Sequence, residues 1–257
     1  MKSRTGISID SIGALGQISV GIVGSKLDLD RRYRDEVSSV ISCQLRFCPV
    51  CCSDAEAASR CKRCVAFVAL SARNSIQGLT PSLLKRVHQA VAPEVESHGR
   101  FRIGNVVVGG KTPSTAFVTS KIDVEKHLKE CFPMFHRLSI EGRSALIIYV
   151  MSILHPFEDG NGRVMRALLT MLAAHGEPGS AHLLFLALYV KLRQREMVSA
   201  VQWLCDGSVR EFTEFMAQAK RHFQSLELEF LSESGRVVRW VSSQLEVCGE
   251  SQTLLNL

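Results

Sequence analysis

The segment from Ser139 to His155 is apolar on nearly every side, and it constrains the fold more than any other stretch of the chain. A helix at the surface of a globular protein has one polar face, so a helix without such a face has to be surrounded by other elements. We therefore expect 139–155 to be the central helix of a helical bundle. The amphipathic stretch 121–137 and the strong helical pattern of 163–175 would pack around it.

Helical periodicity predicts further helices on both sides of this core. One of them begins at Thr80 and Pro81 and runs to about Val91, because a capping hydroxyl residue followed by proline is typical of a helix start. The other helical patterns cover residues 29–41, 55–70, 181–194, 195–205 and 209–233.

One region departs from the helical pattern. Residues 101–108 alternate in polarity and end at Gly109-Gly110, and residues 114–119 form a second short extended segment. Two such segments joined by Gly, Lys and Pro predict a β-hairpin. The fold class that we expect is therefore all-α, a helical bundle with one small hairpin.

The chain has 257 residues, of which 46% are hydrophobic, and this is enough for one large domain. We expect that domain to cover 29–233, between a flexible leader at 1–28 and a tail at 234–257. It would comprise N-terminal helices with a Cys-rich segment, the hairpin, core helices and C-terminal helices, at 29–99, 100–119, 120–176 and 177–233. Gly, Ser and Gln dilute the apolar run of the leader, so we expect no cleaved signal peptide. No stretch approaches the ~18 apolar residues of a membrane span.

The formal net charge is +6. A mild excess spread along the chain suits anionic ligands such as nucleotides but does not predict a nucleic-acid groove. The nine cysteines are an odd number, and six of them cluster between positions 43 and 64, which favours free thiols in a reducing compartment. The spacings Cys48-x-x-Cys51 and Cys61-x-x-Cys64 fit a structural zinc site, whereas the short spacer and the helical pattern around Cys61 favour buried thiols.

A polar break separates the two strongest helical patterns. It reads His155-Pro-Phe-Glu-Asp-Gly-Asn-Gly-Arg163, with Arg166 one turn later. His155 ends the buried helix, and an unperturbed imidazole titrates near pH 6.5, which suits a general base. The Gly-Asn-Gly sequence lets backbone N–H groups line a concavity that opens on the N-terminus of the next helix, where anions are favoured.

Charged side chains flank this concavity. Arg163 and Arg166 are three residues apart, so both guanidinium groups would lie on one face of the helix. Asp159 supplies a carboxylate, and Mg²⁺ binds through one or two carboxylates together with phosphate oxygens. A base, an anion site, two arginines and a metal carboxylate together predict phosphoryl-transfer chemistry. Taken singly, each residue also has a structural explanation, as a helix-end histidine, a capping carboxylate or a solvated arginine.

The string from His155 to Arg163, with Arg166, resembles the Fic family signature H-P-F-x-D/E-G-N-G/K-R at every fixed position. Residues 100–110 are similar to the family's segment leading into the hairpin called the flap, and 188–217 loosely resemble its closing helices. The likeness covers about residues 30–233. It implies a Fic-type helical bundle with a small β-hairpin flap.

The resemblance implies a protein adenylyltransferase that moves AMP from ATP to a Ser, Thr or Tyr hydroxyl of another protein. His155 would be the general base, Asp159 would hold Mg²⁺, and Phe157 would pack inward and lock the loop. Gly162, where another branch of the family has Lys, is similar to the nucleotide-transferring members. The residues that would bind the nucleotide phosphates are Gly160, Asn161, Gly162, Arg163 and Arg166.

The resemblance also implies a docking element for the target protein. An exposed strand edge of the flap would pair with an extended segment of the target. The residues of that edge would be Thr115, Ala116, Phe117 and Val118.

Many family members carry an inhibitory helix that reads S/T-x-x-x-E-G/N. The segment from Ser38 to Cys43 resembles it, but Ser42 stands where Glu belongs, and a serine cannot form a charged pair with Arg166. We expect either no self-inhibition at this site or a partner protein that supplies the Glu. The spacing from Ser225 to Glu229 fits the same pattern, but Phe230 follows, and an ordinary helix interior is the alternative.

Three alternatives remain open at this point. The donor could be UTP, GTP or CDP-choline, because the base pocket is not visible in the sequence. The protein could be a binding module that keeps the fold without the chemistry. It could also remove AMP, which the missing Glu disfavours. The site of action is the producer's cytoplasm or a host cell that receives the protein as an effector.

Overall fold

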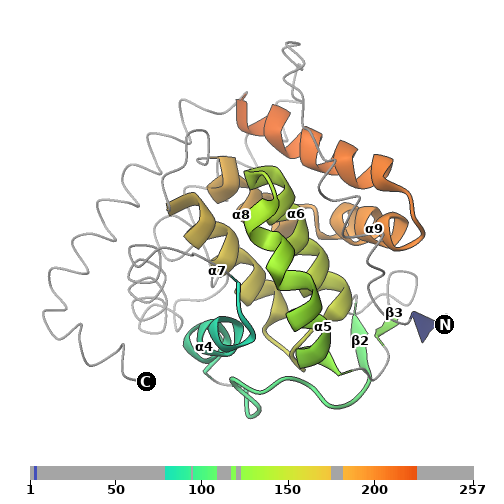
Figure 1. Ribbon diagram of the computed structural model, residues 1–257. Coiled ribbons are helices and arrows are strands. Elements are labelled where there is room, and N and C mark those ends of the chain that lie inside the picture. The colour runs from blue at the N-terminus through green and yellow to red at the C-terminus, as the bar shows by residue number, and fades with distance from the viewer. Residues whose placement is uncertain are drawn as a thin grey trace, which may run out of the picture.

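The computed structural model describes residues 3–4, 79–93, 95–108, 117–119, 123–174 and 182–224. This part of the chain is predominantly helical with one small sheet, so the expected fold class is confirmed (Figure 1). Except for Ser3 and Arg4, the predictions for the leader, for the Cys-rich segment, for Ser38 and Ser42 and for the tail lie outside the described residues.

The central helix forms where the apolar pattern predicts it. α6 spans Ile140–Tyr149 and continues as a π-helix, η2, over Val150–Leu154. Its start is capped by Ser139, whose Oγ accepts the Gly142 N–H at 3.1 Å. All side chains from 145 to 154 are buried, which is the burial that a helix without a polar face requires.

α7, Asn161–Ala174, packs against α6 (Figure 1). It also contacts α4, Pro81–Val91, and α8, His182–Leu192. The predicted start of α4 is confirmed, because Thr80 Oγ1 accepts the Leu83 N–H at 3.0 Å and Pro81 occupies the first turn.

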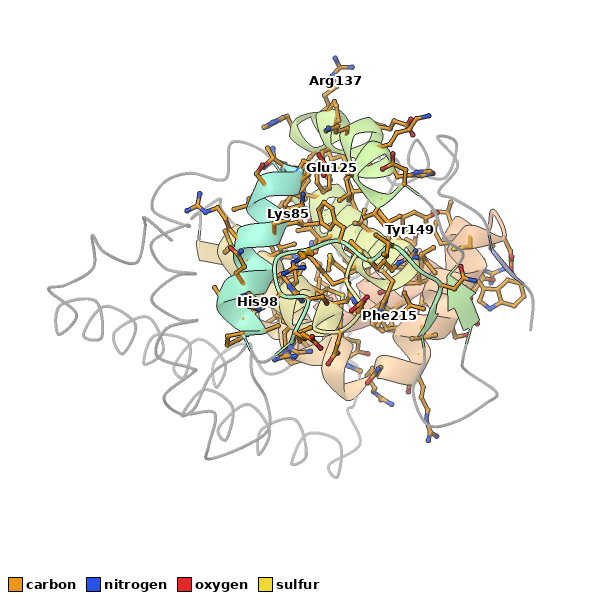
Figure 2. The ribbon with its side chains drawn as sticks, turned by 90° about the horizontal axis from the view of Figure 1, so that it is seen from below. Lys85, His98, Glu125, Arg137, Tyr149 and Phe215 are labelled. Atoms are coloured by element: carbon orange, nitrogen blue, oxygen red, sulfur yellow. The ribbon has the colours of Figure 1, made fainter. Side chains whose placement is uncertain are left out.

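The stretch 121–137 was expected to be one helix, and this is wrong in detail. α5 covers Val124–Cys131, and the chain then tightens into a 3₁₀-helix, η1, over Phe132–Arg137. Pro133 has no N–H for an α-helical hydrogen bond, so the tighter turn replaces the α-helix from there. Lys85 of α4 and Glu125 of α5 form an ion pair at 2.9 Å that ties the two helices together (Figure 2).

The C-terminal helices close the bundle. α8 is followed by α9, Gln194–Cys205, and by a helical segment whose described part covers 209–224. Phe215 of that segment packs against Tyr189 of α8 with ring centroids 5.4 Å apart, and both rings are buried. Among the described residues, no helix combines the length and the apolar character needed to cross a membrane.

The predicted hairpin is present. β2, Val106–Val108, pairs antiparallel with β3, Phe117–Thr119, and Val107 lies opposite Val118. The strand is shorter than the alternating pattern suggested, because residues 101–105 are irregular and Arg102 turns back to the end of the central helix.

A third strand was not expected. β1, Ser3–Arg4, pairs parallel with β3, so the sheet order is β1-β3-β2. Within the described part of the flap, β3 therefore pairs on both of its edges, and the docking role of the flap stays a prediction. The physical reason is that unpaired strand groups pair with whichever extended backbone lies nearest.

Candidate active site

His155 lies at the point where the buried helix ends. Its backbone is left-handed, with φ 47° and ψ 63°, and it is the one non-glycine residue with positive φ among the described residues. Such a conformation costs a residue with a Cβ about 1–2 kcal/mol. Its N–H donates to the Val150 carbonyl at 3.1 Å, which closes the last π-helical turn. The surrounding structure has to hold this residue in place.

The surroundings of His155 keep its imidazole neutral at pH 7. Burial lowers its pKa to about 4, and the positive charge of Arg102 contributes in the same direction. The Asp159 charge and the backbone of Ser152 and Met151 act in the opposite direction. Nδ1 is buried and meets no hydrogen-bond partner within normal geometry in the described structure. The ring can therefore accept a proton.

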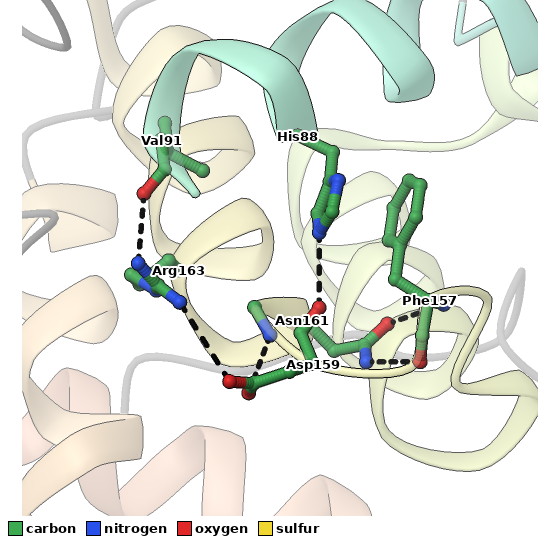
Figure 3. A network of polar contacts seen from close by, with 7 residues as sticks. His88, Val91, Phe157, Asp159, Asn161 and Arg163 are labelled. Atoms are coloured by element: carbon green, nitrogen blue, oxygen red, sulfur yellow. Dashed lines mark hydrogen bonds and ion pairs between the residues drawn. The ribbon is translucent and has the colours of Figure 1, made fainter. Parts of the chain in front are cut away.

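The loop after His155 is held closed by Asn161. The Asn161 side chain is 2% exposed. Its Oδ1 accepts the Phe157 N–H at 3.0 Å, and its Nδ2 donates to the Phe157 carbonyl at 2.8 Å (Figure 3). Phe157 is fully buried, which confirms that it packs inward. Sequence reasoning gave Asn161 a backbone role only, so its side-chain contacts are a new finding.

His88 of α4, which sequence reasoning missed, supports the same loop. Its ring stacks on Phe157 with centroids 3.9 Å apart and an interplanar angle of 6°. Nδ1 accepts the Gly99 N–H at 2.9 Å, so the proton lies on Nε2, which donates to the Asp159 carbonyl at 2.9 Å (Figure 3). Burial lowers the pKa of His88, which favours this neutral form.

A signal for His88 was present in the sequence. It shares a helical face with Leu84, Val87 and Val91, and all four side chains are buried. A histidine on the apolar face of a helix needs partners for its ring nitrogens. The identity of those partners depends on the tertiary fold.

Gly160 begins the turn into α7. Its φ is +79°, and a Cβ there would lie 2.8 Å from Ala92 Cβ and 2.9 Å from His88 Nε2. Its carbonyl accepts the N–H groups of Arg163 and Val164, both at 3.0 Å. Only glycine combines this backbone geometry with this close approach to α4.

The carboxylate of Asp159 is 80% exposed. One oxygen accepts the Gly160 N–H at 2.6 Å, and the other lies 3.9 Å from Arg163 Nη2. Among the described residues, no three His, Cys, Asp or Glu side chains are grouped so that they could hold a metal. A cation at Asp159 would therefore need phosphate or water oxygens as further ligands. The candidate zinc cysteines lie outside the described residues.

The two arginines of α7 have different surroundings. Arg163 Nη1 donates to the Val91 carbonyl at 3.2 Å, so this side chain bridges to the end of α4 (Figure 3). Arg166 is 6% exposed, and its Nη1 lies beside Gly162, 3.4 Å from where a Cβ would be. Both guanidinium groups thus lie close to the glycine turn. That of Arg163 contacts the end of α4, and that of Arg166 lies beside Gly162.

The described residues also border a cavity of about 720 Å³. It lies between α4, the segment 99–103 and the start of α5. No residue of the loop 155–163 lines it, so we do not assign the nucleotide to it.

Part of the chain is similar to known proteins. Residues 78–173 match the model of the Fic/DOC family. The chain is 27% identical over 154 residues to the protein adenylyltransferase Fic of Aedes aegypti, which covers 57% of this chain and 29% of that protein. The chain thus spans less than a third of this relative's length.

The fold is similar to that of a solved structure. A Fic family protein from Desulfovibrio desulfuricans G20 aligns with a TM-score of 0.54 and 18% identity, over 89% of this chain and 78% of that chain. At this identity the likeness supports the fold alone. Residues 78–173, which include the motif from His155 to Arg166, thus match the Fic/DOC family.

Proposed function

We propose that this protein is a Fic-type transferase that moves AMP from ATP onto a Ser, Thr or Tyr hydroxyl of another protein. One observation carries the proposal. Four residues separate the neutral imidazole of His155 from Gly160, which begins the turn into the N-terminus of α7. A proton acceptor and an anion site are thereby joined by a single short loop. The Aedes aegypti relative is named an adenylyltransferase, which supports AMP as the group transferred.

The phosphates would bind at the start of α7. The first N–H groups of a helix and its dipole favour anions there. Arg163 and Arg166 add two positive charges beside the same turn. Because neither arginine is fully exposed, their charges are less screened by water than charges on an open surface.

The residues of this site account for each bond and for the proton in the proposed reaction. The target hydroxyl oxygen attacks the α-phosphorus, a new P–O bond forms, and the bond from the α-phosphorus to the bridging oxygen breaks. The hydroxyl proton passes to the imidazole of His155, and pyrophosphate leaves with the bond electrons. The arginines stabilise the negative charge that builds up on the departing phosphates.

Mg²⁺ fits the residues present. The Asp159 carboxylate is exposed and directed by the Gly160 N–H, so it can serve as the protein's ligand. When bound, the cation would neutralise charge on the phosphate oxygens.

A pKa of about 4 makes His155 a weak base in the free protein. Phosphate anions next to the ring would favour its protonated form and raise its pKa toward neutrality. The base would therefore gain strength when the nucleotide is bound.

Docking of the target at the flap is part of the proposal. An extended target segment would have to displace β1 from β3 or pair with the other strand, β2. Thr115, Ala116, Ser38 and Ser42 lie outside the described residues, so the docking turn and the lack of a self-inhibitory Glu remain predictions.

The deciding experiment uses labelled nucleotides. The full chain is incubated with Mg²⁺, a cell lysate and ATP labelled at the α- or the γ-phosphate. We expect protein-bound label from the α-position only, and none with His155→Ala. Parallel reactions with α-labelled UTP and GTP, and with CDP-choline labelled at both phosphates, identify the donor.

Label from the γ-position would replace the proposal with a kinase. Label from UTP, GTP or CDP-choline in preference to ATP would keep the transferase and correct the donor. Complete absence of label with every donor would favour a binding module and reject the enzyme.

A further inference from the structure

Arg102 has a place in this site that its sequence position does not reveal. It belongs to the irregular segment between α4 and β2, and its side chain is only 3% exposed. A guanidinium keeps its charge in proteins, and burying that charge is costly unless hydrogen bonds compensate for it. The hydrogen bonds of Arg102 therefore indicate which role its buried charge has.

Arg102 satisfies three consecutive carbonyl groups at the end of the central helix. Nη2 donates to the Leu154 carbonyl at 3.0 Å, and Nε donates to the His155 carbonyl at 2.8 Å. The backbone N–H of Arg102 donates to the Pro156 carbonyl at 2.9 Å. The last carbonyl groups of a helix have no partners within that helix, so Arg102 acts as a cap supplied from another part of the chain.

The Arg102 side chain caps the carbonyl group of His155, the residue with the strained backbone conformation. His155 is left-handed, and it follows a π-helical turn, so its backbone departs from the helix on both counts. Strained conformations persist only where several contacts enforce them. A planar guanidinium can bind two neighbouring carbonyl groups in a fixed geometry, which the single ammonium of lysine cannot do.

Arg102 also reaches the flap. Its Nη1 donates to the carbonyl of Gly104, and β2 begins two residues later at Val106. One guanidinium thus connects the root of the flap with the backbone of His155.

We propose that Arg102 is a positioning residue that holds His155 in its left-handed conformation and fixes the root of the flap relative to it. This inference rests on the proposed function, because it takes His155 to be the base. Arg102 would touch neither the target nor the nucleotide. Its loss would misplace the imidazole, and a shift of about 1 Å can cost on the order of 100-fold in rate.

The test compares three variants of the full chain. Arg102→Lys keeps the charge and loses the fork, and Arg102→Met removes both. Arg143→Met is the matched control, because Arg143 also donates from Nε to a backbone carbonyl, that of Phe135 at 3.2 Å, but lies at the other end of the central helix. Thermal unfolding of each variant verifies that the protein is folded at the assay temperature.

The kinetic outcome separates positioning from binding. We expect both Arg102 variants to lower kcat by about 10- to 100-fold while KM for the nucleotide changes by less than about threefold. Arg143→Met should lower the unfolding temperature without lowering kcat. Equal kcat values for wild type and folded Arg102→Lys would overturn the inference, and so would a loss confined to KM.

A second readout does not depend on transfer. The chain has eight histidines, and the imidazole NMR signals of His155 can be assigned with His155→Gln. In Arg102→Met the titration midpoint of His155 should rise above that of the wild type, because a nearby positive charge that lowers the pKa is removed. In Arg143→Met it should not move.

If the wild type transfers nothing from any donor, the proposed function fails, yet the NMR titration still decides whether Arg102 sets the state of His155. An unchanged midpoint and unchanged His155 signals in Arg102→Met would sink the inference while leaving a transferase intact.

Discussion

Gly160→Ala tests whether the loop between His155 and α7 lies against α4. The added methyl group would meet Ala92 Cβ at 2.8 Å and His88 Nε2 at 2.9 Å, and the backbone there has φ +79°. Ala92 has no rotamer by which to move away. His88 is fixed by its stack on Phe157 and by two hydrogen bonds. Neither neighbour can yield cheaply.

The size of the effect has two parts. An alanine forced into the left-handed region costs about 1–2 kcal/mol. Crowding in a close-packed region costs about 1–3 kcal/mol more. We therefore expect Gly160→Ala to lower the free energy of unfolding by about 2–5 kcal/mol.

Gly207 provides the matched control. Its φ is +89°, but nothing lies within 4 Å of the position that a Cβ would take. Gly207→Ala should therefore show the backbone cost alone, about 1–2 kcal/mol. Gly162→Ala adds a Cβ at an ordinary 3.4 Å from Arg166 Nη1 and should stay within about 1 kcal/mol of wild type, since alanine also favours the helix.

The assay is urea unfolding at pH 7.5, followed by circular dichroism, for all three variants. Adding Ala92→Gly to Gly160→Ala should restore part of the stability, because it removes the nearer contact, and a double-mutant cycle measures the coupling. If Gly160→Ala cost no more than Gly207→Ala and showed no coupling to residue 92, the loop would not be packed on α4 as described.

Three further predictions concern the groups around this loop. Asn161→Ala leaves the buried N–H and C=O of Phe157 without their partner, so urea unfolding should show a loss of about 1–3 kcal/mol for each group. A total loss under about 1 kcal/mol would show that the two Asn161 hydrogen bonds contribute little to stability. His88→Phe keeps a ring to stack on Phe157 but removes both hydrogen bonds, so we expect the free energy of unfolding to fall by about 1–3 kcal/mol. We also expect transfer to require a higher Mg²⁺ concentration, because the loop that carries Asp159 is loosened. Wild-type stability together with a wild-type Mg²⁺ requirement would contradict the role of His88. Because the folded protein holds the pKa values of His155 and His222 at about 4, below their usual 6.5, the unfolded chain binds more protons in that window. Stability should therefore fall as pH is lowered from about 6.5 to 4, and His222→Gln should make the fall shallower; unfolding free energies that do not change between pH 7 and 5 would refute this.

The sequence determined much of the fold because its strongest signals are local. A helix with no polar face has to be central, and α6 with η2 is buried throughout. Thr80 before Pro81 starts α4, since a cap acts within one turn. The hairpin follows from alternation and turn residues. Asp159, Gly160 and Arg163 lie within a few residues of one another, so their proximity needed no tertiary information.

The tertiary structure decided what holds that loop in place. His88 reaches the Asp159 carbonyl across 71 positions, and Arg102 reaches the His155 carbonyl across 53. Periodicity marks a residue as buried but does not name its distant partner, so both supports were missed. The same holds for β1, whose pairing with β3 depends on which extended backbone lies nearby. The low pKa of His155 likewise comes from burial and from the Arg102 charge, which exist only once the chain has folded.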